Sequence, residues 1–369
     1  MFEKEMVDQL ILAGVDIVVS LPCDKNKGFT DCIHDNMKVI DITREEDGVG
    51  ICAGVSLMGK RPVMSIQSSG LGNMMNAVMS LAACYELPLV ILASWRGVDG
   101  EKIEAQIPFN SRIQEMLDCY GISHIEIDEA SDIPSVHTEI DRAFSENRIT
   151  VILIHPDMWK ESKRMNGCYP PRSRSVRGSP DFTTEEPHMT RLEAIGATLS
   201  AIGDEDILVS NIGVPSKEVM AIRDRPTNFY MLGSYTQATP IAVGMAAVSE
   251  RRVFVIDGDG SLLGSSIFPV LSSAELKADL TVVCMDNGTF GSTGDQINPS
   301  YSHVDMASVA RGYGIEDVRT AYSRKEIESC LASPRGIRFV QVMIVPGNSD
   351  SPNITYSAVE IKRRFMRSV

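Results

Sequence analysis

Gly258-Asp259-Gly260-Ser261 follows a short apolar run, and Asp286-Asn287-Gly288 follows a second one. Apolar runs of this length that are rich in β-branched residues predict buried parallel strands. In an open α/β sheet, ligands bind at the carboxyl ends of the strands. Asp259 would supply a carboxylate there and Asn287 an amide oxygen, and glycine lets the backbone come close to an anion. The two motifs therefore predict a site for Mg²⁺ and a phosphate or diphosphate group.

The spacing of the two motifs supports this interpretation. Gly260 and Asn287 are separated by 26 residues, which is room for one helix, predicted at 265–277, and for the return to a parallel strand. Asp-Gly and Asn-Gly are also common in simple turns. Two unrelated turns explain the ordered series of strand, GDGS, helix, strand and DNG less well, so we prefer a metal-phosphate site.

Composition limits the classes of protein that fit. The chain has 369 residues, of which 43% are hydrophobic, so we expect two domains. Its formal net charge of -14, with no basic cluster outside a short stretch at 160–177, argues against nucleic acid as a partner. Eight cysteines without CxxC spacing favour neither a zinc ribbon nor a disulfide framework, and they fit a reducing cytoplasm.

The N-terminal residues and the longest apolar runs indicate whether the protein is exported or inserted into a membrane. The first 16 residues contain an apolar patch that is too short and too acidic for a signal peptide. No run of about 18 apolar residues occurs, so no membrane helix is predicted. We expect a protein that is not exported and has no membrane partner.

Strands and helices alternate on both sides of a segment rich in proline, serine and arginine, which predicts two doubly wound α/β domains with parallel sheets. We interpret 1–160 as the first domain, 161–187 as a linker and 188–369 as the second domain. The predicted strands are 17–20, 39–41, 63–66, 89–92 and 151–154, then 207–209, 228–231, 253–256, 280–285 and 339–343. The predicted helices are 3–13, 46–58, 72–84 and 135–146, then 190–202, 216–223, 239–249, 265–277, 305–312 and 324–332.

The GDGS and DNG motifs at this spacing resemble those of the thiamin diphosphate-dependent enzymes. The resemblance implies that Asp259, Asn287 and the backbone carbonyl of Thr289 hold Mg²⁺. It implies further cofactor contacts from two loops and the GDGS turn, made by Gly213, Gly233, Ser234, Tyr235, Gly258, Gly260, Ser261, Phe290 and Gly291. Relatives usually carry Met or Ile where Tyr235 stands, and that side chain props the bent cofactor.

Three acidic residues, Glu45, Glu46 and Asp47, open a predicted helix after the strand at 39–41. Acidic residues are favoured at a helix N-terminus by the helix dipole, which suffices to explain Glu46 and Asp47. By resemblance, a glutamate nine residues before Gly54 binds the aminopyrimidine ring of the cofactor, and this position is Glu45. The cofactor uses that ring as its own base, and a glutamate on the opposite ring nitrogen stabilises the required tautomer. Glu45 is therefore the predicted catalytic residue.

A second loop, Gln67-Ser68-Ser69-Gly70-Leu71-Gly72-Asn73, joins a predicted strand to a helix. It lacks the last glycine of a dinucleotide-binding fingerprint, so an NAD-type oxidoreductase is a poor alternative. A helix N-terminus there would still suit an anion. This loop and Ser94-Trp95-Arg96-Gly97 resemble the equivalent loops of the sulfopyruvate and phosphonopyruvate decarboxylases, which implies a small, anionic 2-oxo acid as substrate.

The acidic substituent of the substrate is harder to assign. The segment 102–108 is similar to the sulfopyruvate form, because Ala105 and Ile107 stand where phosphonopyruvate relatives tend to carry proline and histidine. Cationic and polar residues at predicted strand ends are the candidates for binding a sulfonate or phosphonate. These candidate substrate residues are Lys25, Lys27, Gln67, Ser68, Ser69 and Arg96.

The C-terminal residues 357–365 are similar to the end of a sulfopyruvate decarboxylase β-type subunit, so the resemblance implies α-type and β-type parts fused in one chain. It implies decarboxylation of 3-sulfopyruvate to sulfoacetaldehyde and CO₂, as in coenzyme M biosynthesis. Phosphonopyruvate decarboxylation is the nearest alternative, and a catalytically silent cofactor-binding scaffold is the non-enzymatic one. Because relatives assemble the site between subunits, we expect a homodimer or a higher homo-oligomer.

Overall fold

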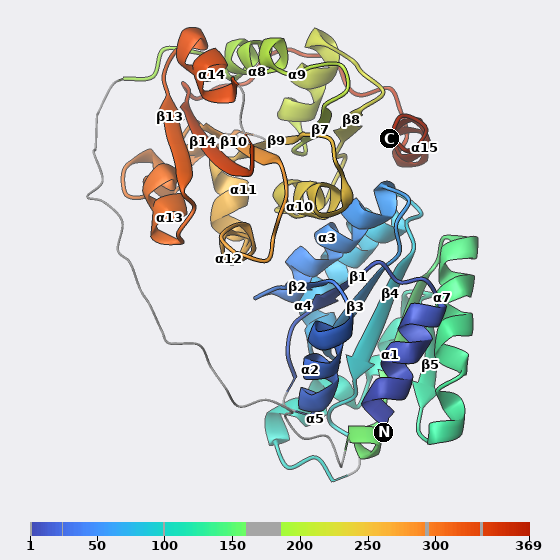
Figure 1. Cartoon of the computed structure of the whole chain (residues 1–369). Coiled ribbons are helices and arrows are strands. Elements are labelled where there is room, and N and C mark those ends of the chain that lie inside the picture. Colours follow the sequence, from blue (N-terminus) through green and yellow to red (C-terminus); the bar gives the residue numbers. More distant parts are fainter. Residues whose placement is uncertain (1, 24, 99, 160–185, 292–294, 333–334) are drawn as a thin grey trace. The chain divides into compact units, whose positions relative to one another are not determined.

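The computed structural model describes residues 2–23, 25–98, 100–159, 186–291, 295–332 and 335–369. The chain divides into two compact units, Met1–Arg172, called unit 1, and Ser173–Val369, called unit 2 (Figure 1). The predicted linker at 161–187 falls almost wholly outside the described residues, so its limits stay a prediction. No helix in the described part of the chain is long and apolar enough to span a membrane.

Unit 1 contains a six-stranded sheet with the strand order β2-β1-β3-β4-β6-β5, in which every neighbouring pair is parallel. Helices α1, α2 and α7 pack together, and α3 packs with α4. The strands are β1 Ile17–Ser20, β2 Val39–Asp41, β3 Pro62–Gln67, β4 Leu89–Ser94, β5 Ser123–Ile127 and β6 Ile149–Ile154. The α-helices are α1 Phe2–Leu12, α2 Lys27–Asn36, α3 Glu45–Leu57, α4 Gly70–Ala77, α5 Ile107–Asn110, α6 Ile113–Cys119 and α7 Ser135–Glu146.

Unit 2 contains a second six-stranded parallel sheet, with the order β13-β14-β10-β9-β7-β8, and a small β11-β12 hairpin. Helices cover both faces of this sheet (Figure 1). The strands are β7 Ile207–Ser210, β8 Asn228–Tyr230, β9 Val253–Gly258, β10 Leu280–Asp286, β11 Thr289–Phe290, β12 Gln296–Ile297, β13 Asp317–Ala321 and β14 Ile337–Met343. The helices are α8 Arg191–Ala201, α9 Val214–Ile222, α10 Ala238–Val248, α11 Asp259–Gly264, α12 Phe268–Leu271, α13 Met306–Gly312, α14 Arg324–Leu331 and α15 Ala358–Met366.

The two units share one topology. If the six main strands of each unit are numbered along the chain, both sheets have the order 2-1-3-4-6-5. In both sheets the direction of winding reverses between the first and third strands, which is where an open α/β sheet binds its ligands. The prediction of two doubly wound parallel-sheet domains is confirmed.

The core of unit 1 explains the small residues of helix α3. All thirteen residues of α3 are buried, including its three leading acids. A Cβ on Gly48 would lie 2.6 Å from Met64 Cε and 2.7 Å from Ile42 Cδ1. Close packing of α3 on the sheet therefore favours glycine at this position, because a larger side chain would have to displace the ends of Met64 and Ile42.

Two tryptophans mark different parts of unit 1. Trp159 is buried against Phe2 and Phe29, with ring centroids 4.8 and 5.5 Å away. Trp95 directly follows β4 and stands edge-on to His155, with the ring centroids 6.5 Å apart. Trp159 thus belongs to the apolar core, and Trp95 belongs to the carboxyl edge of the sheet.

The predicted helix at 265–277 is wrong. Helix α11 begins inside the GDGS motif at Asp259 and ends at Gly264, and Ser265 has extended backbone angles. A second short helix, α12, has Pro269 near its start and ends at Leu271. Proline is tolerated only in the first turn of a helix, so it separates the two short helices here. The predicted helix at 72–84 is also modified, because α4 continues as a π-helix over Val78–Ala83.

Candidate active site

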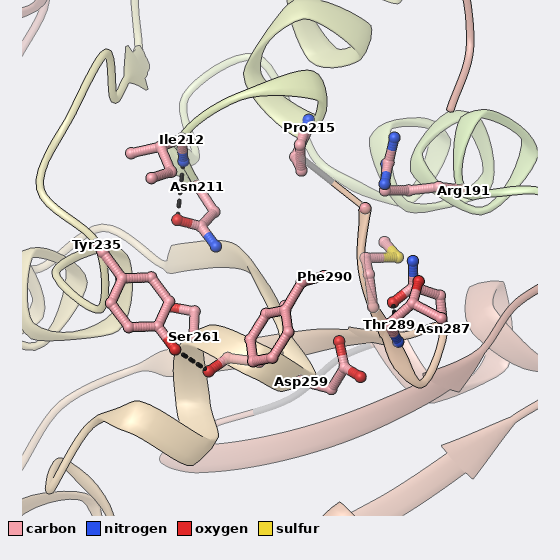
Figure 2. A pocket seen from close by; sticks show the side chains of 14 residues that line it. Arg191, Asn211, Ile212, Pro215, Tyr235, Asp259, Ser261, Asn287, Thr289 and Phe290 are labelled. Atoms are coloured by element: carbon pink, nitrogen blue, oxygen red, sulfur yellow. Dashed lines mark hydrogen bonds between the residues drawn. The ribbon is translucent and has the colours of Figure 1, made fainter. Parts of the chain in front are cut away.

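A pocket of about 310 Å³ lies in unit 2 at the carboxyl ends of β7, β9 and β10 (Figure 2). This is the reversal point of the sheet. Nine predicted cofactor or metal residues line it: Tyr235, Gly258, Asp259, Gly260, Ser261, Asn287, Thr289, Phe290 and Gly291. The structure therefore brings the GDGS and DNG motifs together around one cavity.

Three predicted cofactor residues, Gly213, Gly233 and Ser234, are not among the lining residues. Gly213 nevertheless adjoins the pocket in sequence, because the preceding Asn211 and Ile212 line it. Gly213 has a φ of 79° and precedes helix α9, whose first turn has no side-chain cap. Backbone N–H groups of a helix start are suited to an anion.

Asp259 is almost fully buried, and its two carboxylate oxygens differ in their surroundings. Oδ2 accepts hydrogen bonds from the Gly288 backbone at 3.0 Å, Asn298 Nδ2 at 2.8 Å and Ser300 Oγ at 2.5 Å. None of the hydrogen bonds described for this part of the chain uses Oδ1. The carboxylate is thus fixed through Oδ2, and Oδ1 is the oxygen suited to bind a cation.

The DNG turn fixes Asn287. Its Oδ1 accepts a hydrogen bond from the Thr289 backbone at 3.1 Å, which leaves one lone pair of this oxygen for a metal. Gly288 has a φ of 68°, and a Cβ there would lie 2.8 Å from the Tyr301 Cα. Only glycine suits both the positive φ and this close contact.

Two further carboxylates lie close to the pocket floor. Burial raises the pKa of Asp286 to about 7, and the nearby charge of Asp259 adds to this shift. Burial also raises the pKa of Asp257, whose Oδ2 accepts a hydrogen bond from Thr239 at 2.6 Å. A diphosphate would be repelled by this acidic environment unless a cation were bound with it.

The donor set suits Mg²⁺ bound together with a diphosphate. Among the described residues, no group of three or more His, Cys, Asp or Glu side chains could hold a metal. Asp259 Oδ1, the Asn287 amide and the Thr289 carbonyl instead offer three oxygens. Mg²⁺ is typically bound by one or two carboxylates and completed by water and substrate phosphates. The residues present therefore fit a metal held partly by its ligand.

Two aromatic side chains cover the GDGS turn (Figure 2). The Tyr235 hydroxyl donates a hydrogen bond to the Gly260 carbonyl at 2.6 Å. A Cβ on Gly260 would meet the Phe290 ring at 2.6 Å, so glycine is needed for this contact. The loop that carries Tyr235 is strained, because Ser234 and Thr236 have φ values of 69° and 75°. Ser234 Oγ is buried with no hydrogen-bond partner in the described residues, as an oxygen awaiting a ligand would be.

In unit 1, Glu45 is the first residue of α3 and is buried. Its Oε2 accepts a hydrogen bond from Asn73 Nδ2 at 3.1 Å. A Cβ on Gly70 would lie 2.5 Å from Oε1, so glycine makes room for this carboxyl group. Gly70 and Asn73 belong to the QSSGLGN loop and helix α4, which the structure thus joins to the predicted catalytic residue.

Four predicted substrate residues lie together at the ends of β3 and β4. The Arg96 backbone donates to Ser68 Oγ at 2.9 Å, and Ser68 Oγ donates to Asn110 Oδ1 at 2.5 Å. Ser69 bonds Gln106, and the half-buried Gln67 ends β3. Lys25 is half-buried, and Lys27 is exposed at the start of α2.

Arg96 already has a counter-ion. Its Nε donates to Glu101 Oε2 at 2.8 Å, and both side chains are buried, with exposures of 2% and 6%. The Arg96 guanidinium lowers the pKa of Glu101 to about 2. A substrate anion at this position would meet a neutralised cation, so the charge of Arg96 alone does not explain anion binding.

Sequence comparison defines the class of this two-unit protein. Residues 2–121 match the "thiamine pyrophosphate enzyme, N-terminal TPP binding domain" family, and residues 212–340 match the corresponding "C-terminal TPP binding domain" family. A solved benzoylformate decarboxylase from Polynucleobacter necessarius covers 94% of the chain, and 99% of that structure is covered, with a TM-score of 0.69 and 14% identity. The fold and the family matches are those of thiamin diphosphate enzymes.

Three relatives narrow the class. A sulfopyruvate decarboxylase from Methanosarcina acetivorans is 37% identical over 100% of this chain and 97% of its own length. A phosphonopyruvate decarboxylase from Streptomyces viridochromogenes is 29% identical over 98% of this chain and 93% of its own length. A sulfopyruvate decarboxylase subunit beta from Methanothermobacter thermautotrophicus is 39% identical over 49% of this chain and 96% of its own length. The chain belongs to the family of thiamin diphosphate-dependent decarboxylases, and it is a carbon–carbon lyase.

Proposed function

We propose that the enzyme decarboxylates 3-sulfopyruvate to sulfoacetaldehyde and CO₂ with thiamin diphosphate and Mg²⁺, as a step of coenzyme M biosynthesis. The observation that carries the choice of substrate is the 37% identity to a sulfopyruvate decarboxylase over the full chain. The phosphonopyruvate decarboxylase is less similar, at 29%. The Ala105 and Ile107 positions support the same choice.

In this proposal the unit 2 pocket holds the diphosphate and the metal. Asp259, Asn287 and the Thr289 carbonyl bind Mg²⁺, while the backbone around Gly213 and the GDGS turn bind phosphoryl oxygens. Gly233, Ser234, Tyr235 and Phe290 surround the remainder of the cofactor. When bound, thiamin diphosphate supplies an electron sink for the electron pair released as CO₂ leaves.

Glu45 of unit 1 is proposed to hold a proton at the aminopyrimidine ring. Asn73 Nδ2 donates a hydrogen bond to Glu45 Oε2, and we propose that Oε1 carries the proton that faces the cofactor. Oε1 is the oxygen that faces Gly70, where no side chain interferes. Gly70 and Asn73 therefore set the orientation of the acid.

The substrate carries a carboxylate and a sulfonate, and we propose that residues at the carboxyl edge of unit 1 bind them. Ser68 and Ser69 supply hydroxyl groups, and Gln67 supplies an amide. Because Glu101 compensates Arg96, we propose that Lys25 supplies positive charge for the substrate at this edge. The Arg96–Glu101 pair would then hold the loop rather than bind the anion directly.

We propose a cytoplasmic homo-oligomer. Seven cysteines in the described part of the chain are free, which supports a reducing compartment. Glu45 belongs to unit 1 and the pocket belongs to unit 2. In relatives the two parts are named as subunits, which supports an assembly of more than one copy.

The test is the steady-state kcat/KM of the purified enzyme for 3-sulfopyruvate and for phosphonopyruvate. We expect a preference for 3-sulfopyruvate of at least about 10-fold, which corresponds to about 1.4 kcal/mol of transition-state binding. Activity should disappear with EDTA and return with Mg²⁺. A preference for phosphonopyruvate would contradict the substrate, and activity without any thiamin diphosphate would contradict the mechanism.

A further inference from the structure

Arg191 is the one cation among the residues that line the unit 2 pocket in the described part of the chain. It is the first residue of helix α8, and its side chain is 7% exposed. Figure 2 shows it at the side of the pocket near Thr289 and Asn287. The guanidinium is therefore buried in protein but adjacent to the proposed metal and diphosphate site.

The guanidinium is held through two of its three nitrogens. Nε donates to Glu218 Oε2 at 2.8 Å, and Nη2 donates to Glu218 Oε1 at 3.3 Å and to Asn348 Oδ1 at 2.9 Å. The described hydrogen bonds leave Nη1 unused. Nη1 lies 3.4 Å from the position that a Cβ on Gly291 would occupy, and Gly291 is a pocket residue. Among the described residues, no hydrogen-bond partner is found for this donor group, which lies beside the pocket residue Gly291.

Glu218 and Asn348 fix the orientation of the Arg191 guanidinium and therefore of its Nη1. Glu218 is fully buried and binds the guanidinium through both carboxylate oxygens. Asn348 accepts from Arg191 and donates from Nδ2 to the Gly291 carbonyl at 2.7 Å. The guanidinium of Arg191 is thereby linked to the loop 287–291, which carries the proposed metal ligands Asn287 and Thr289. A donor that is already oriented loses little entropy when it binds an anion.

A contribution to stability alone is a weak explanation for the buried ion pair between Arg191 and Glu218. A buried ion pair is costly to desolvate, and an apolar pair of similar volume often stabilises a protein as well. An apolar pair would not bring a hydrogen-bond donor to a pocket lined by Asp259. With Mg²⁺ bound, a thiamin diphosphate still carries net negative charge at its terminal phosphoryl group.

We propose that Arg191 binds the terminal phosphoryl group of the cofactor through Nη1 and so makes the pocket selective for the diphosphate over the monophosphate. The inference rests on the proposed function, because it assumes that this pocket receives thiamin diphosphate. It goes beyond that function by assigning a recognition role to a residue outside the GDGS and DNG motifs.

The experiment measures Kd by calorimetry at saturating Mg²⁺, with the full chain freed of cofactor by dialysis. Thiamin diphosphate and thiamin monophosphate are titrated into the unchanged chain, Arg191→Lys and Arg191→Gln. We expect both variants to bind the diphosphate roughly 10- to 100-fold more weakly, because a hydrogen bond to a charged group is lost. The Kd for the monophosphate should change by less than about 3-fold.

Arg252→Lys is the matched control. Arg252 also forms a two-nitrogen contact with a carboxylate, since Nε and Nη2 donate to Asp206 at 3.0 and 2.5 Å, but it does not line the pocket. Its replacement should leave the affinities for both ligands unchanged. Thermal unfolding of every variant checks the fold, and Arg191→Lys keeps the charge if Arg191→Gln does not fold.

Two results would overturn the inference. One is an unchanged diphosphate affinity in a folded Arg191 variant, and the other is an equal loss of affinity for both ligands with a lower unfolding temperature, which indicates a structural role. If the unchanged chain binds neither ligand, the proposed function itself is wrong and the inference falls with it. That outcome is seen before any variant is made.

Discussion

At the scale of single residues, Glu45 carries the clearest expectation for catalysis. Replacing it with Gln keeps the size of the side chain and its contact with Asn73, but removes the group that holds a proton. General acid–base residues contribute about 10²- to 10⁴-fold to rate, so kcat for Glu45→Gln should fall at least about 100-fold. Steady-state decarboxylation assays measure this.

Glu46→Gln is the control for Glu45→Gln. Glu46 is the next residue of α3 and forms an ion pair with Arg44 at 2.7 Å, and we assign it no catalytic role. Its replacement should leave kcat within about 3-fold of the unchanged enzyme. A near-normal rate in Glu45→Gln would remove the proposed role of this residue.

The Arg96–Glu101 pair predicts a dependence of stability on pH. The pKa of Glu101 is lowered to about 2 in the folded state, so this pair stabilises the fold above the ordinary carboxyl range and loses its effect as pH falls toward about 2. Urea unfolding between about pH 5 and about pH 3 should show a shallower loss of stability in Glu101→Gln than in the unchanged chain. Parallel curves for the two proteins would refute the pairing.

At the scale of elements, helix α4 and helix α3 meet where Gly70 leaves room for Glu45. A Cβ at Gly70 would lie between 2.5 and 2.8 Å from the Glu45 side chain. Gly70→Ala should displace the Glu45 carboxyl and lower kcat roughly 10- to 100-fold, since small misplacements of catalytic groups are costly. The helix itself should not be weakened, because alanine is a better helix former than glycine.

Gly196→Ala gives the opposite result and serves as the control. Gly196 lies within α8, and a Cβ there would meet no atom within 4 Å. We expect this change to stabilise the protein by about 0.5 to 1 kcal/mol and to leave kcat unchanged. Urea unfolding and decarboxylation assays on both variants separate an effect on the helix from an effect on Glu45. Equal activity in the two variants would argue against the steric role of Gly70.

Most of the strands that were predicted from the sequence are more deeply buried than β5 and β13, which were not predicted. Continuous apolar runs such as β4 and β10 are fully buried and were predictable from their composition. Strands β5 and β13 were missed. Each is the edge strand of its sheet, and each carries mostly half-exposed or exposed residues. The polar side chains of β5 and β13 remove the apolar run on which such a prediction depends, whereas the edge strand β8 is buried and was predicted.

At the scale of the whole molecule, local motifs predicted most of the pocket but not Arg191. The GDGS and DNG residues are adjacent in sequence to strands whose ends must meet, so their convergence followed from topology. Arg191 is held beside the pocket by Glu218 and Asn348, which lie 27 and 157 residues further along the chain. No spacing rule connects three such positions.

The oligomeric state is the prediction that concerns the intact enzyme. Light scattering coupled to size exclusion should give a mass at least twice the 40.4 kDa of one chain. Specific activity should fall on dilution as the assembly dissociates, since association of subunits depends on protein concentration. An active monomer would contradict the assembly.

The placement of the two tryptophans gives unit 1 an optical signal of its own. The chain contains only Trp95 and Trp159, and both belong to unit 1. Tryptophan emission therefore follows unit 1 alone, whereas far-ultraviolet circular dichroism follows the helices of both units. If the two signals change at the same denaturant concentration, the units unfold as one cooperative system. If the two signals change at different denaturant concentrations, the units unfold separately. Repeating the measurement with added thiamin diphosphate then shows how far the cofactor stabilises unit 2 by itself.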